Sequence, residues 1–183
     1  MKTVLIGLVL LLGGCRSLDS PNPASPYFAY TTGWVVRLDR LLMIPPDAAT
    51  VRLQYGEIVP RNSVQEHDAY CVVELNTVSP NPQILKPGRF KVWRVTRSVE
   101  TVAAAPSPFI KVGYVQDDSG PSFLYYKTEF HLRDPAQPNL RSMTCAWDQM
   151  APINRTFMRH LTLNEIRSAL GNWITLTPPG EVL

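Results

Sequence analysis

The sequence predicts a mainly β domain, an antiparallel β-sandwich or a partly open barrel of about seven to nine strands, with one short helix near the C-terminus. Short runs rich in valine, tyrosine, phenylalanine and threonine recur along the chain and are separated by proline and glycine clusters. The 17 prolines suit strand ends and turns better than helix interiors. An α+β fold, with the helix packed across one sheet, is the alternative.

The strand pattern is clearest at residues 50–55, where Val51, Leu53 and Tyr55 point to one side while Arg52 and Gln54 point to the other. This alternation predicts a half-buried antiparallel strand. The other predicted strands occupy residues 33–38, 70–75, 90–99, 109–115, 123–132, 142–147 and 173–177, with a short one at 41–44.

Two of these segments carry further information. Apolar residues occupy both parities of residues 90–95, which indicates either a central strand covered on both faces or a bulge that switches register. Residues 110–114 and 124–130 flank a polar stretch at 116–121, and this arrangement predicts a hairpin.

The helix is predicted from its ends. Thr162 with Glu165 three residues later forms a capping box, and Gly171 provides a left-handed stop. A helix of residues 163–170 would place its apolar side chains on one face, so we expect it to lie on the sheet as a lid or plug. The apolar residues are Leu163, Ile166, Ala169 and Leu170.

The first residues have the composition of a signal peptide. Lys2 precedes an apolar run at residues 4–12, and Gly13 and Gly14 precede Cys15. The segment from Leu12 to Cys15 resembles the lipobox of bacterial lipoproteins. That resemblance implies removal of residues 1–14, acylation of Cys15, and, since residue 16 is not aspartate, retention at the outer membrane.

The remaining chain divides into two parts. Residues 15–30 are rich in serine and proline and predict a disordered tether, whereas residues 31–183 are long enough for one domain with a single core. The formal charge of +3 is scattered, which argues against nucleic-acid binding.

Cys71 and Cys145 are the cysteines left once Cys15 is assigned to lipid. An even pair in an exported chain predicts a disulfide, with two buried free thiols as the alternative. Neither cysteine belongs to a CxxC or Cys/His cluster, so we predict no metal site and no cofactor.

Candidate catalytic groups are scattered. Glu66, His67 and Asp68 are consecutive, while His131 and His160 stand alone. Solvated loop positions explain these residues better than catalysis does. Asp117 and Asp118 form a partial calcium-loop pattern that fits a hairpin tip, and Asn154 begins a glycosylation sequon.

The four tryptophans fit core packing better than a glycan or peptide groove. They are Trp34, Trp93, Trp147 and Trp173.

The body of the chain resembles uncharacterised proteobacterial envelope proteins, a resemblance that implies a compartment and no activity. It is carried by segments around Pro45, Cys71, Gly88 and Cys145 and by the capping region at 161–166. We therefore expect a lipid-anchored binding or accessory module rather than an enzyme, with Arg52 and Gln54 on a strand edge that recruits an envelope protein. A periplasmic hydrolase with scattered acid and base residues is the alternative.

Overall fold

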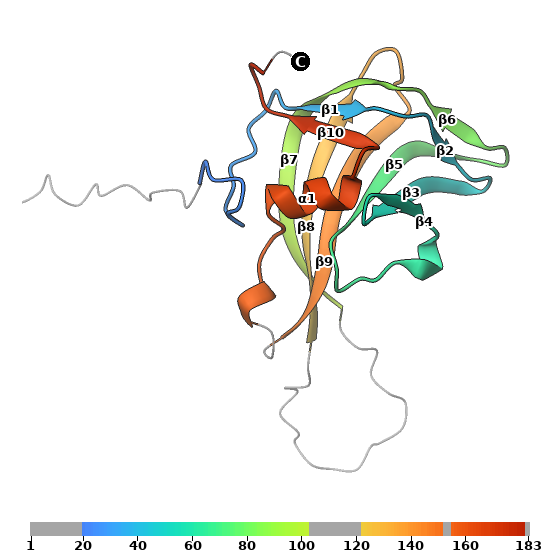
Figure 1. Cartoon of the computed structure of the whole chain (residues 1–183). Coiled ribbons are helices and arrows are strands. Elements are labelled where there is room, and N and C mark those ends of the chain that lie inside the picture. The colour runs from blue at the N-terminus through green and yellow to red at the C-terminus, as the bar shows by residue number, and fades with distance from the viewer. Residues whose placement is uncertain (1–19, 103–121, 152–154, 182–183) are drawn as a thin grey trace, which may run out of the picture.

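The computed structural model describes residues 20–102, 122–151 and 155–181. It confirms a mainly β fold: one antiparallel eight-stranded sheet curls into a half-barrel, and a two-stranded ribbon lies beside it (Figure 1). The sheet order is β10-β1-β7-β8-β9-β5-β3-β4, and β2 pairs with β6. The strands are β1 (Val35–Leu38), β2 (Leu42–Ile44), β3 (Ala48–Gln54), β4 (Glu57–Val59), β5 (Tyr70–Ser79), β6 (Gln83–Leu85), β7 (Gly88–Val102), β8 (Ser122–Arg133), β9 (Leu140–Ala151) and β10 (Ile174–Thr177).

The long strands β7, β8 and β9 form the centre of the sheet. Their inner faces bury large apolar side chains, among them Phe90, Phe130 and Met143. The register of β7 against β8 shifts between Val92 and Arg94, which confirms the bulge that the mixed parity of residues 90–95 allowed.

One predicted pairing is wrong. Over residues 123–130, β8 pairs with β7 on one side and with β9 on the other, so neither edge is left for a hairpin with residues 110–114. Residues 110–114 themselves lie outside the described part of the chain.

The predicted disulfide joins Cys71 of β5 to Cys145 of β9. The two residues are direct cross-strand partners, with Cα atoms 4.0 Å apart, and both are fully buried. Their separation of 74 residues closes a long loop, and in the chain-entropy description such a cross-link stabilises the fold by about 4 kcal/mol.

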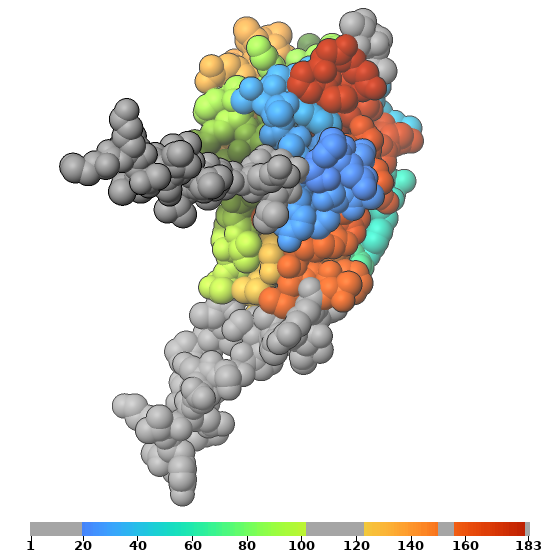
Figure 2. All heavy atoms as spheres, turned by 90° about the vertical axis from the view of Figure 1, so that its left-hand side faces the viewer, coloured from blue at the N-terminus to red at the C-terminus, as the bar shows by residue number. Residues whose placement is uncertain are grey.

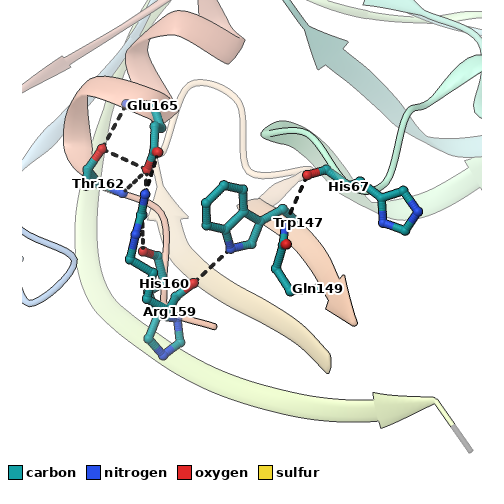
Figure 3. Close-up of polar contacts among 7 residues, drawn as sticks. All are labelled: His67, Trp147, Gln149, Arg159, His160, Thr162 and Glu165. Carbon is teal, nitrogen blue, oxygen red and sulfur yellow. Dashed lines mark hydrogen bonds and ion pairs between the residues drawn. The ribbon is translucent and has the colours of Figure 1, made fainter. Parts of the chain in front are cut away.

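Helix α1 (Leu163–Leu170) begins and ends where the capping residues predict. Thr162 Oγ1 accepts the N–H of Glu165, and the Glu165 carboxylate accepts the N–H of Thr162 at 2.8 Å. The same carboxylate accepts hydrogen bonds from both terminal guanidinium nitrogens of Arg159, and the backbone carbonyl of Arg159 accepts the indole N–H of Trp147 (Figure 3). The start of the helix is thereby fastened to the inner face of β9.

The helix closes the open side of the half-barrel (Figure 1). Its four apolar side chains are buried, and it packs against β5, β10 and β3. Arg167 donates to the carbonyl of Leu176 in β10, and the carbonyl of Ala169 accepts the N–H of Gly56 in the β3–β4 turn. One short helix therefore bonds to both margins of the sheet.

The contact at the helix end requires two glycines. Gly56 and Gly171 both have positive φ, and a Cβ on Gly171 would lie 2.4 Å from the Cα of Gly56. Tyr55, also at positive φ, precedes Gly56 and completes a two-residue turn of the kind that joins tight hairpins.

The N-terminal segment differs from the predicted tether. Arg97 donates to the carbonyls of Pro26 and Phe28, and Pro23 accepts the N–H of Leu163. Tyr30 packs its ring 5.1 Å from that of Phe130, centroid to centroid. Residues 20–30 are thus seated on the domain (blue in Figure 2), and the prediction of a disordered tether is wrong for them.

We predict that Thr162→Ala lowers the free energy of unfolding by about 1 kcal/mol, because the N-cap hydrogen bond to Glu165 is lost. Asn164→Ala, at an exposed position of the same helix, is the matched control and should change stability little. Urea unfolding of the two variants measures the difference. Equal losses would show that the cap does not stabilise the helix.

Candidate functional site

The segment at residues 65–68 contains the acidic and histidine triplet that the sequence singles out, and each of its residues is held by a polar contact. Gln54 accepts the N–H of Gln65 and donates to its carbonyl. Glu66 accepts the hydroxyl of Tyr125, and Asp68 accepts that of Tyr55.

His67 is held through both its side chain and its backbone. Its Nδ1 lies 2.5 Å from Oδ1 of Asp148. Its backbone carbonyl accepts the side-chain N–H of Gln149 at 3.1 Å (Figure 3). The backbone N–H of Asp148 donates to the carbonyl of Glu66. The sequence could not reveal these partners, because β9 lies about eighty residues further along the chain.

The electrostatics of this pair are asymmetric. Asp148 is buried, whereas the side chain of His67 is 69% exposed. Burial raises the pKa of Asp148, and the attraction of His67 only partly offsets that rise. A buried carboxylate against an exposed imidazole can orient the ring, but its clearest effect here is to fix residues 65–68 against the ends of β8 and β9.

The predicted partner edge needs correction. Gln54 alternates with the buried Leu53 and so lies on the outer side of the sheet, but residues 65–68 cover that side and leave Gln54 1% exposed. At Arg52 and Gln54, β3 is paired with both β5 and β4, so the free edge is not at these residues.

The other candidates do not join this cluster. His131 lies 3.0 Å from the hydroxyl of Thr96, and His160 packs edge-on against Tyr126, where burial lowers its pKa to about 4. Cys15, Asp117, Asp118 and Asn154 lie outside the described residues. Trp34 and Trp147 are core residues and Trp173 packs against the core, whereas Trp93 is 44% exposed, against expectation.

An open stretch of sheet edge lies next to the predicted one. Strand β4 covers β3 only opposite Arg52, Leu53 and Gln54, so residues 48–51 have no strand on that side. They border a groove of about 540 Å³. Its walls come from three segments, within residues 43–47, 48–52 and 58–61, and no motif in the sequence connects them.

The groove combines apolar and charged side chains. Met43 is 55% exposed and Ile58 is 38% exposed, although both are apolar. Arg52 and Arg61 line the same groove, and among the described residues neither forms an ion pair with a carboxylate. Burial lowers the pKa of Arg52, and the positive charge of Arg61 lowers it further. An occupant with a carboxylate would relieve this repulsion.

Within the described ranges, no group of three or more His, Cys, Asp or Glu side chains could hold a metal ion, and no helix is long and apolar enough to cross a membrane. Comparison with protein-family models, curated proteins and solved structures finds no match to this chain. Function is therefore inferred from geometry.

We predict that Asp148 makes stability fall as pH rises. Because the folded-state pKa of Asp148 lies above its unfolded value, its contribution to stability is complete when the carboxyl is protonated and is lost as pH rises through the raised pKa. Between pH ~4 and ~8, the wild type should lose unfolding free energy relative to Asp148→Asn. Urea unfolding at several pH values measures this.

The matched variant is His67→Ala. It removes the contact that lowers the pKa of Asp148, so its loss of stability with rising pH should exceed that of the wild type. If the unfolding free energies of the wild type, His67→Ala and Asp148→Asn changed with pH in parallel, Asp148 would not be the source of the pH dependence.

Proposed function

We propose that this chain is a non-catalytic binding or accessory module of the bacterial cell envelope, anchored by lipid at Cys15 and facing the periplasm from the outer membrane. Its task is to hold an extended segment of a partner protein in the groove beside β3. The observation that carries the proposal is the open side of β3 at residues 48–51, which pair with β5 but have no strand on the β4 side and form one wall of that groove.

A strand edge binds an extended chain through its backbone N–H and C=O groups, and side-chain pockets supply selectivity. The edge at Ala48, Ala49 and Thr50 carries small side chains, so another backbone can approach it closely. The exposed Met43 and Ile58 offer apolar contact to one side chain of the partner. Arg52 and Arg61 favour a partner segment that also carries a carboxylate.

The envelope location has separate support. The lipobox resemblance at Cys15 implies acylation, and the buried Cys71–Cys145 disulfide suits an oxidising compartment. Anchoring would raise the local concentration of the groove near other envelope proteins, which matters most for a weak extended-segment interaction.

The groove is tested by in-cell photo-crosslinking from Ile58. We expect a discrete envelope partner to be trapped there, and Arg61→Glu to lower its binding about tenfold, because a charge-assisted hydrogen bond to the partner carboxylate is lost and repulsion is added. The yield of cross-linked partner, followed by titration of that partner, measures the effect.

The matched control is a crosslinker at Val99, an exposed apolar position on β7 away from the groove. It should trap no such partner. The proposed use of the groove would be overturned if Val99 trapped the partner in equal yield, or if Arg61→Glu left the yield of cross-linked partner from Ile58 unchanged.

Anchoring is tested separately with Cys15→Ser. This variant should lose acyl labelling and leave the membrane fraction, because the acceptor thiol is gone. Unchanged labelling and fractionation would show that Cys15 is not the anchor.

A periplasmic hydrolase is the second candidate, favoured by the His67–Asp148 contact alone. Under the binding proposal, His67→Ala should leave trapping from Ile58 and the cellular phenotype intact once stability is matched. Loss of the phenotype with partner trapping preserved would favour catalysis at His67.

A further inference from the structure

We infer that the outer face of the sheet around Trp93 is a second interaction surface, which docks on the anionic surface of a lipid bilayer. The Trp93 patch consists of Arg89, Lys91, Trp93 and Arg94 of β7 and Arg133 of β8. It is separate from the groove beside β3 and does not depend on acylation of Cys15.

The bulge in β7 builds the patch. Phe90 and Val92 are buried on the inner side of the sheet, so regular alternation would send Trp93 outward and Arg94 inward. The register shift between Val92 and Arg94 inserts one extra residue, and Val95 instead packs against the core. Trp93 and Arg94 therefore both face outward, next to Arg89 and Lys91 on the same strand.

Arg133 connects β8 to the β7 residues of the patch. Lys91 and Arg133 are direct partners across the β7–β8 ladder. The Arg133 guanidinium carbon lies 5.0 Å from the centre of the Trp93 ring, and the His131 ring lies 5.6 Å from it. Beside them the surface is hollowed by about 510 Å³, and Asn76, Asp134 and Arg141 also line this hollow.

The charge of the patch is not balanced locally. Two neighbouring cations of the sheet are paired: Lys127 binds Glu100, and Arg141 binds Glu74 at 2.9 Å. In the part of the chain that the structure describes, Arg89, Lys91, Arg94 and Arg133 form no ion pair.

Two acids lie close to the patch. Glu129 Oε1 lies 3.6 Å from Nδ1 of His131, and Asp134, which lines the same hollow, accepts the N–H of Ala136. The four cations outnumber these two acids and form no ion pair within the described residues, which favours an external anion.

The chemistry of the patch favours a bilayer as that partner. Tryptophan prefers the boundary between headgroups and acyl chains, and surrounding Lys and Arg are attracted to an anionic membrane. An exposed Trp93 ringed by cations on an outer sheet face fits this boundary.

Vesicle co-sedimentation tests the inference. The mature chain carrying Cys15→Ser should bind vesicles containing phosphatidylglycerol, and binding should weaken as salt is raised because the patch charges become screened. Arg94→Gln and Arg133→Gln should each lower the partition coefficient about fivefold, and Trp93→Ala should lower it as well. Circular dichroism confirms that each variant remains folded.

The matched control is Arg40→Gln. Arg40 is exposed and stacks over Trp173 at 5.3 Å, an equivalent pair outside the patch, so its loss should leave vesicle binding unchanged. Equal weakening by Arg40→Gln, salt-independent binding, equal binding to phosphatidylcholine vesicles, or binding to a soluble polyanion without binding to vesicles would each overturn the inference. If a patch variant unfolds, the dependence of vesicle binding on salt and on lipid composition, measured with the Cys15→Ser chain, still tests the inference.

Discussion

A sheet that curls without closing must cover its open side, and the rest of this fold depends on how α1 does so. The helix buries four apolar side chains inside the half-barrel and bonds to both sheet margins, through Arg167 at β10 and through Ala169 at the β3–β4 turn. Its start is fixed by the capping box and by Arg159, which also contacts Trp147 of β9. A helix of this length is marginal alone, so its stability comes from this packing.

Closure by a helix explains why the edge beside β3 can remain open. The turn at Gly56 is held by α1, so β4 need not pair along all of β3 to keep the margin in place. On the outer side, Gln54, Tyr125 and Asp148 fasten residues 65–68, which follow the groove residue Arg61 after a short loop. The suggestive triplet at Glu66, His67 and Asp68 thus stabilises the structure next to the groove.

Features set by nearby residues could be predicted from the sequence. The packing of one segment over another that is distant in the chain could not. The helix bounds and the Cys71–Cys145 pair follow from capping residues and cysteine parity, and the mixed parity of residues 90–95 allowed the bulge. Gln54 was wrongly predicted to lie at an exposed edge. Apolar alternation shows to which side of the sheet its side chain points, but not that residues 65–68 cover that side. Residues 20–30 look like a tether until Arg97, far along the chain, binds their carbonyls. The short strands β4 and β6 were not predicted, because the segments Glu57–Val59 and Gln83–Leu85 show no apolar alternation.

Both candidate surfaces arise where the regular β ladder is interrupted, and the kind of interruption determines the kind of recognition. At β3 the partner strand stops early, so backbone groups and small side chains become available to an extended chain. At Trp93 an extra residue in β7 turns two neighbouring side chains outward on the face of the sheet, so side-chain charge and aromatic surface are presented there. One edge can therefore recognise backbone, while the other face can recognise charge, and the two need not compete for the same partner.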